Sequence, residues 1–191
     1  MKAPSMRNVT FALAPLLTLT VASLVRADEP AKSTSIAIAG DAFKLTAPAD
    51  WVAQKPRSKM IEHEFSVPAA KGDELDGRVT MMSAGGGVEA NVQRWYDQFK
   101  QPDGGSTKER AKVKKLDIAG QEVTLVDIAG AYNDKPAPMA PGVERPHYRM
   151  LGAIIVTKKS GNYFIKFYGP QKTVADHEAG FVKMLDGLKP N

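Results

Sequence analysis

The run from Tyr148 to Thr157 carries apolar residues on both faces of a strand. Met150 and Ile154 alternate with Leu151 and Ile155 along it. Successive side chains of a strand point to opposite faces, so a strand that is apolar on both must be covered on both. We therefore expect this strand to lie centrally in a sheet, with a layer of structure over each face.

Other segments alternate in the same way and predict further strands. Turn signals such as Gly40-Asp41 separate several of them, which favours antiparallel pairing. Pro48 and Pro56 bracket an expected loop around Trp51. The predicted strands cover residues 35–39, 42–47, 60–67, 78–83, 111–118, 122–131, 148–157 and 162–168.

Two segments switch to helical spacing. Val88, Val92, Trp95 and Phe99 fall on one stripe and predict an amphipathic helix over residues 88–100. A second helix is predicted over 173–188. The order of four strands, helix, four strands, helix predicts an α+β domain over residues 35–191. We expect one mainly antiparallel sheet and two amphipathic helices, in an α/β/α sandwich.

Three parts of the chain carry a resemblance to a known family. They are the segment Phe43–Trp51, the aromatic strand Tyr163–Tyr168 and the final amphipathic helix. In this order of elements the chain resembles the PsbP-like family of α/β/α sandwich domains, exported proteins named for an extrinsic subunit of photosystem II. The resemblance implies a non-catalytic assembly or binding module.

The first 27 residues have the pattern of an export signal. Lys2 and Arg7 precede the apolar run from Val9 to Val25, and small residues allow cleavage after Ala27. The alternative is a membrane anchor, but the run contains Pro15 and is shorter than the roughly 20 apolar residues that a spanning helix needs. We expect a periplasmic or extracellular protein, without a stable membrane span after cleavage.

The mature chain is expected to fold without covalent cross-links. It contains no cysteine, and cleavage would leave 164 of the 191 residues, enough for a core of its own. Residues 28–34 are expected to be a flexible lead-in to a single domain.

Net charge argues against nucleic-acid binding. Without the signal, 23 basic residues face 21 acidic ones, which gives a net charge of +2. Binding to phosphates requires a dense field of lysine and arginine. The densest run, residues 108–115, alternates in a way that suits an exposed edge strand, where lysines oppose strand-to-strand association.

The run Gly85–Ala90 fits the pattern G-x-G-x-x-G/A but not its usual setting. In a dinucleotide-binding fold this pattern follows the first strand of a parallel sheet, with an acidic ribose ligand about 20 residues later. Here it follows four predicted strands, and Asp103 falls in a loop at that offset. We interpret the glycines as a turn and expect no cofactor; a bare anion at the helix start is the alternative.

The ionisable residues form no recognised catalytic or metal motif. His63, His147 and His177 lack metal-ligand spacing, and no serine stands in G-x-S-x-G. His63 lies on an apolar strand face, so it is either a core histidine or a pocket base. Its neighbours Glu62 and Glu64 should point to the opposite face. The acidic run 72–77 suits a hairpin turn better than calcium, because it lacks the register of a calcium loop.

The long loop 133–146 is the strongest indication of a binding role. Loops of this length inside compact domains are often functional, and four prolines stiffen this one. The alternative is an idle insertion. Tyr132 and Tyr148 flank the loop and would either wall a shallow site or only pack the hairpin end. The partner-binding residues predicted here are Tyr132, Pro138, Met139, Glu144, Arg145 and Tyr148.

Two hypotheses about function follow from these patterns. The first is an exported, non-enzymatic binding or assembly module that recognises a protein or an envelope component through the loop and the neighbouring sheet. The second is a small hydrolase or ligand carrier with a pocket near His63 and a tyrosine.

Overall fold

The computed structural model describes residues 33–135, 140–158 and 160–191. The predicted signal and most of the predicted lead-in lie outside this part of the chain. The elements, in order, are β1 (Thr34–Ile38), β2 (Phe43–Ala47), β3 (Val52–Gln54), β4 (His63–Val67), β5 (Gly77–Ala84), α1 (Val88–Tyr96), β6 (Phe99–Lys100), α2 (Thr107–Arg110), β7 (Lys112–Ile118), β8 (Gln121–Asp134), β9 (Val143–Thr157), β10 (Gly161–Pro170), α3 (Gln171–Asp186) and β11 (Lys189–Pro190).

The strands form two antiparallel sheets instead of the single predicted one. The large sheet has the order β3-β4-β5-β10-β9-β8-β6, with β7 also paired to β8, and the small sheet has the order β1-β2-β11. The second sheet arises because the β1–β2 hairpin pairs with the C-terminal β11 and not with the larger sheet. The mainly antiparallel α+β class is confirmed.

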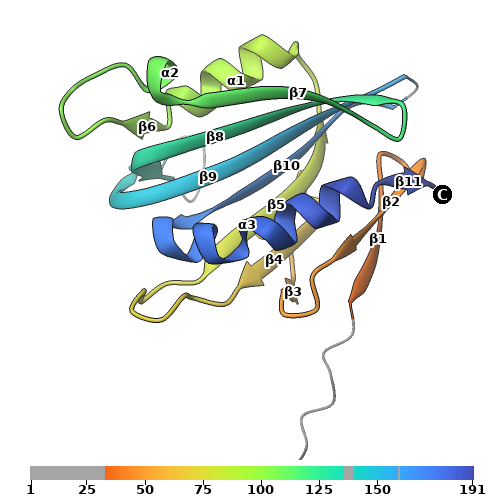
Figure 1. Cartoon of the computed structure of the whole chain (residues 1–191), viewed down its shortest axis with the longest axis horizontal. Coiled ribbons are helices and arrows are strands. Elements are labelled where there is room, and N and C mark those ends of the chain that lie inside the picture. Colours follow the sequence, from red (N-terminus) through yellow and green to blue (C-terminus); the bar gives the residue numbers. More distant parts are fainter. Residues whose placement is uncertain (1–32, 136–139, 159) are drawn as a thin grey trace, which may run out of the picture.

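Helices cover both faces of the large sheet, as the pattern of β9 predicted. Helices α1 and α2 lie on one face, and α3 lies on the other beside the small sheet (Figure 1). Residues that alternate along β9 divide between the two layers: Leu151 and Ile155 pack with α3, and Met150 and Ile154 pack with α1. Strand β9 lies between β10 and β8, so the prediction of a central strand is confirmed.

Helix α1 is shorter than predicted because the chain changes structure at Asp97. The helix ends at Tyr96, and Phe99–Lys100 forms β6, which pairs with Tyr132 and Ala131 of β8. Trp95 sets the position of the helix: its ring lies on Gly152 of β9, where a Cβ atom would overlap the ring. The sequence also did not indicate the short helix α2.

Two predicted loops are partly strand. Strand β8 continues to Asp134 and β9 begins at Val143, so residues 133–134 and 143–146 of the predicted loop are strand. The segment after Trp51 forms β3, which pairs with β4 at the edge of the sheet. Strand β4 starts at His63, later than predicted.

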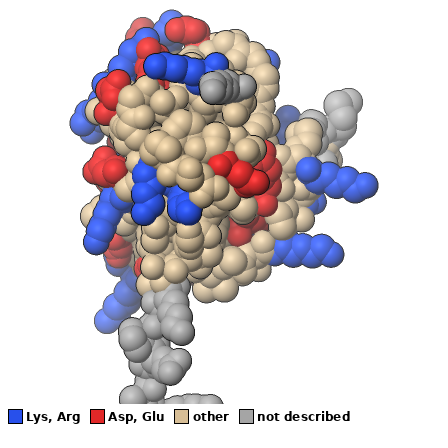
Figure 2. All heavy atoms as spheres, turned by 90° about the vertical axis from the view of Figure 1, so that its right-hand side faces the viewer, with Lys and Arg blue, Asp and Glu red and all other residues tan. Residues whose placement is uncertain are grey.

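The basic run 108–115 lies at an edge, as predicted, but it is not one continuous strand. Residues 107–110 form α2, and β7 pairs only with β8 and is exposed along most of its length. Figure 2 shows that lysine, arginine and acidic residues are interspersed on one end of the molecule. Among the described helices, none combines the length and the apolar character that membrane crossing requires.

The acidic run 72–77 forms part of the turn between β4 and β5, where two of its carboxylates serve the fold. The Asp76 carboxylate accepts hydrogen bonds from the Ser66 hydroxyl and the Ala69 amide. Asp73 reaches the start of α3 and accepts from the Thr173 amide (2.9 Å) and hydroxyl (2.6 Å). Helix α3 begins after Pro170, which offers no side-chain cap, so Asp73 serves as a cap from another loop.

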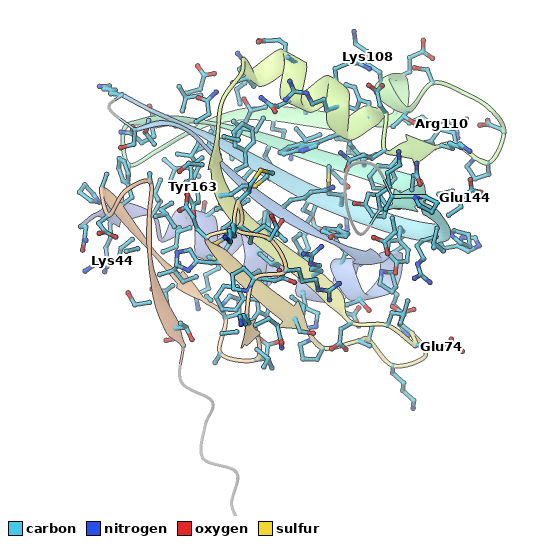
Figure 3. All side chains as sticks on the ribbon, turned by 180° about the vertical axis from the view of Figure 1, so that it is seen from behind. Lys44, Glu74, Lys108, Arg110, Glu144 and Tyr163 are labelled. Atoms are coloured by element: carbon cyan, nitrogen blue, oxygen red, sulfur yellow. The ribbon has the colours of Figure 1, made fainter. Side chains whose placement is uncertain are left out.

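Replacing Asp73 by alanine is expected to lower the free energy of unfolding by about 1–2 kcal/mol, the usual cost of a lost helix cap. The change leaves the Thr173 amide without its acceptor. Urea unfolding followed by circular dichroism measures this loss. Glu74→Ala is the matched control, because Glu74 is exposed at the tip of the same turn (Figure 3). Equal losses in the two variants would contradict the capping role.

Candidate functional site

A β-bulge in the β8–β9 hairpin builds the site. Gly130 pairs with Tyr148, but Tyr132 pairs with Arg145, so Pro146 and His147 together oppose the single residue Ala131. His147 has a φ of 55°, the left-handed conformation of an inserted bulge residue. The extra residue turns Arg145 and Tyr148 into one cavity, although three positions apart on a regular strand would put them on opposite faces.

Three tyrosines pack together behind this bulge. The rings of Tyr132 and Tyr148 are parallel within 3° and 6.0 Å apart, and the ring of Tyr168 lies 5.1 Å from that of Tyr132. All three are buried, and burial raises the pKa of each phenol. The phenols therefore remain protonated at neutral pH and can donate hydrogen bonds. Tyr132 and Tyr148 pack the hairpin end, and Tyr148 also lines the cavity beside it.

A buried ion pair holds the floor of the site in place. Arg78 binds Glu64 through two bonds, Nε to Oε1 at 2.8 Å and Nη2 to Oε2 at 3.0 Å, and its Nη1 donates to the Tyr168 hydroxyl. Glu64 also accepts from the Arg57 amide at 3.0 Å. Burial alone would raise the pKa of Glu64, but the bonds from Arg78 and Arg57 lower it overall. The Glu64 carboxylate is therefore ionised, and both of its oxygens accept hydrogen bonds within the protein.

Arg78, Tyr148 and Tyr168 line an open cavity of about 520 Å³, which we call the Arg–Tyr basin. Its charges are balanced, with three arginines and three acidic residues in the lining. Arg145 lies 3.6 Å from Asp134 (Nε to Oδ2), and this Nε is buried without a hydrogen-bond partner in the described structure. The basin is lined by Arg57, Ser66, Glu74, Leu75, Asp76, Arg78, Asp134, Arg145, Tyr148, Tyr168 and Gly169.

The structure brings together some of the predicted site residues and separates others. Arg145 and Tyr148 line the basin, and Tyr132 lies directly behind Tyr148. Glu144 does not line it; it is exposed and pairs with Lys100 of β6 at 3.1 Å (Figure 3). Pro138 and Met139 lie outside the described residues.

His63 lies apart from this basin, against the small sheet. Its Nε2 is 2.9 Å from the carbonyl oxygen of Ala37, so one ring nitrogen already has a partner. A cavity of about 180 Å³ adjoins His63, and no tyrosine lines it. Glu62 and Glu64 also border this cavity, but the Glu64 carboxylate binds Arg78 on the opposite face of β4, as expected from strand alternation. Glu64 is committed to Arg78, so it does not serve His63 as a base.

The other two histidines do not line the basin either. His177 on α3 contacts the carbonyl oxygen of Pro68 and lies 3.1 Å from Asp50. His147 occupies the bulge and is exposed. Within the described residues, no three histidine or acidic side chains are arranged to hold a metal ion.

The glycine run before α1 is a turn whose polar groups are used within the chain. Gly86 has a φ of 93°, which favours glycine, and its carbonyl accepts from the Asn162 side chain at 2.9 Å. The Asn91 side chain donates to the carbonyl oxygens of Gly85 and Gly87. The carbonyl oxygens of the three glycines are thus bonded within the protein.

Sequence reasoning did not identify Arg78, Tyr168 or Glu64 as site residues. The sequence of β10 does carry a sign of buried polar groups on this face, because Lys166 and Tyr168 continue the face begun by Phe164. A lysine on an otherwise apolar face of a buried strand marks a position where charge must be accommodated. The partners that accommodate it lie on β8 and in the turn before β6, and a single sequence does not show which segments adjoin.

No protein-family model and no curated protein matches this sequence. Among solved structures, the cyanobacterial PsbP protein (CyanoP) of Synechocystis sp. PCC 6803 is similar, with a TM-score of 0.50 at 9% identity over 86% of this chain and 96% of that one. LpqN of Mycobacterium tuberculosis, described as involved in cell envelope biogenesis, has a TM-score of 0.49 at 9% identity, covering 86% and 87%.

A protein of unknown function from Pseudomonas aeruginosa is similar as well, with a TM-score of 0.43 at 17% identity over 83% of this chain and 97% of that one. Identities this low speak to the arrangement of elements and not to activity. The antiparallel sheets, covered by α1 and α3, agree with the likeness to CyanoP. The chain has a PsbP-like α+β fold.

Proposed function

We propose that this protein is an exported, non-enzymatic binding module that docks a segment of a partner protein, or of another envelope component with peptide-like chemistry, in the Arg–Tyr basin. The observation that supports this most is the bulge at Pro146 and His147, which directs Arg145 and Tyr148 into one cavity with Arg78 and Tyr168. Bulges are frequent beside functional sites because they re-aim side chains.

The chemistry of the basin suits recognition. Its donors are arginines and protonated phenols, and its acceptors are the carboxylates of Glu74, Asp76 and Asp134. A polypeptide offers matching groups of both kinds, whereas a simple anion or cation would meet as many like charges as opposite ones. Arg145 has a buried nitrogen without a partner, which a carbonyl or carboxylate of the partner would satisfy.

The export part of the proposal relies on the signal pattern of residues 1–27. A chain that matures outside the cytoplasm and carries no disulfide depends on its core and on ion pairs such as Glu64–Arg78. The partner would then be met in the periplasm or outside the cell.

Site-directed photo-crosslinking tests the proposal in the exporting cell. A photoreactive phenylalanine analogue at Leu75, which lines the basin and is 44% exposed, is expected to cross-link one protein or envelope component. The same analogue at Lys44, at the opposite end of the molecule, is expected to give no such product (Figure 3). Adding Arg145→Glu to the Leu75 derivative should reduce the product at least tenfold, because it reverses the charge beside Asp134.

Arg145→Glu should leave the melting temperature within a few degrees of that of the parent, because Arg145 makes no hydrogen bond in the core of the described structure. Equal products from Leu75 and Lys44, or a product that survives Arg145→Glu, would show that the basin is not the docking site.

A further inference from the structure

A second cavity lies at another part of the α1 layer, between α1, α2 and the strands β7 and β8. Its volume is about 490 Å³, within the range of about 300–1,000 Å³ that small-molecule sites occupy. We call it the α1–β7 groove and define it by Val88, Val92 and Tyr96 of α1, Val113 and Lys115 of β7, and Thr124 of β8. It shares no lining residue with the Arg–Tyr basin.

The groove exists because α1 is held over the centre of the sheet and leaves the edge uncovered. Trp95 fixes the helix above Gly152 of β9, two strands in from β7. Val113 pairs with Val126 across the sheet, and Val126 packs in the α1 layer, so Val113 belongs to the same face. Val113 is nevertheless 46% exposed. The apolar side chain of Val113 is therefore exposed to solvent beside the apolar face of α1.

An unpaired hydroxyl lies in the floor of this groove. Thr124 is 2% exposed, and its Oγ1 has no hydrogen-bond partner among the described residues. Buried hydroxyls are normally paired, so this atom indicates that the groove receives a polar group. Lys115 is the residue directly opposite Thr124 on β7, and its ammonium lies on the same side of the strand.

The charge at the mouth favours an anionic end. Lys108 and Lys115 line the groove against a single acidic residue, Glu89. The Nζ of Lys115 has only a long contact with Glu122, at 3.5 Å, and its side chain is 66% exposed. Figure 3 shows Lys108 on the outer side of α2, at the edge of this layer. A cation would be repelled here, and a neutral chain would leave both lysines and Thr124 unused.

We propose that the α1–β7 groove binds a free, single-chain fatty acid, with its hydrocarbon chain between Val92 and Val113 and its carboxylate between Thr124 and Lys115. A peptide fits less well, because its backbone amides and carbonyls would need partners, and the floor offers one hydroxyl. The proposal is independent of docking in the Arg–Tyr basin, and either can hold without the other.

Calorimetric titration of the purified protein with dodecanoate, below its micellar concentration, tests this site. Saturable binding at one molecule per chain is expected. Val113→Glu should weaken it at least tenfold, because it places a carboxylate in the apolar wall. The matched control is Leu116→Glu on the other face of β7: Leu116 is 38% exposed and does not line the groove, so binding should be unchanged.

Two further arms test the head group and the source of the ligand. Dodecyltrimethylammonium should bind at least tenfold more weakly than dodecanoate, and Thr124→Val should weaken dodecanoate while the melting temperature is kept. Any binding to phosphatidylglycerol vesicles should be the same for the parent protein and for Val113→Glu. The proposal is overturned by absence of saturable dodecanoate binding, by equal effects of Val113→Glu and Leu116→Glu, by equal affinity for the cationic amphiphile, or by unchanged affinity in Thr124→Val.

Discussion

Replacing Glu64 by glutamine is expected to lower the free energy of unfolding by about 3–5 kcal/mol, the usual cost of removing one member of a buried ion pair. Glu64 is 3% exposed and holds Arg78 through two bonds. Glutamine keeps the size of the side chain but leaves the Arg78 guanidinium without its countercharge. Urea unfolding at neutral pH measures the loss, and the wild-type protein should show a clearly higher midpoint.

An exposed ion pair provides the matched control. Glu144→Gln removes the partner of Lys100, but both side chains are more than half exposed, so the expected loss is below about 1 kcal/mol. A double variant, Glu64→Leu with Arg78→Met, removes both charges and should recover much of the loss. If Glu64→Gln costs no more than Glu144→Gln, the buried pair does not stabilise the fold in the way the geometry indicates.

The ion pair also links stability to the proposed docking site. Arg78 donates to the Tyr168 hydroxyl, and both residues line the Arg–Tyr basin. Glu64 therefore positions one wall of the basin from beneath, without lining it. A partner that contacts Arg78 would meet a guanidinium already fixed in orientation, which reduces the entropy lost on docking.

The layered fold could be predicted because its strongest signals are local. The two-faced apolar pattern of β9 requires cover on both sides, and the stripes of α1 and α3 supply it. The turn at Ala39–Gly40 and the one at Ala119–Gly120 both have positive φ at their central residues, as tight hairpins need. The second sheet could not be predicted, because β11 has two residues and its pairing with β2 depends on where α3 ends.

The site was predictable only in part, because it depends on register. Arg145 and Tyr148 were recognised by their place beside a proline-rich loop, but their shared direction comes from the bulge at Pro146 and His147. An inserted residue of this kind leaves no periodic trace in the sequence. Arg78 comes from β5, two strands away from β9, so its arrival at the same cavity follows from sheet order alone.

Lys166 is the most unusual charge in the α1 layer. It lies on β10 between Phe164 and Tyr168, and its ammonium contacts the side-chain oxygen of Gln98 and the Tyr132 hydroxyl. The rings of Tyr132 and Tyr168 lie 4.9 Å and 4.7 Å from its Nζ. Among the described residues, no carboxylate contacts it. Lys166 thus receives neutral partners and aromatic faces in place of a countercharge.

These surroundings lower the pKa of Lys166 to about 7. Burial is the main cause, and the nearby positive charge of Arg78 adds to it, while Asp134 acts in the opposite direction. In the unfolded chain the same group titrates near its ordinary value of 10.5. Below pH 7 the ammonium is charged in both states, and the full penalty of burying it opposes folding. As the pH rises from 7 towards 10.5, the folded state releases the proton first and the penalty is relieved.

Replacing Lys166 by methionine is therefore expected to raise the free energy of unfolding more at pH 6 than at pH 9. The gain should differ between the two pH values by about 1–2 kcal/mol, because each pKa unit corresponds to about 1.4 kcal/mol and partial exposure screens the charge. Urea unfolding of both proteins at each pH measures it, and taking the difference between them cancels other titrating groups. Lys44→Met, at the far end of the molecule, should show no such change (Figure 3). A gain for Lys166→Met that is constant with pH would mean that Lys166 stays protonated in the folded protein, and that the two tyrosine rings stabilise its charge more than burial opposes it.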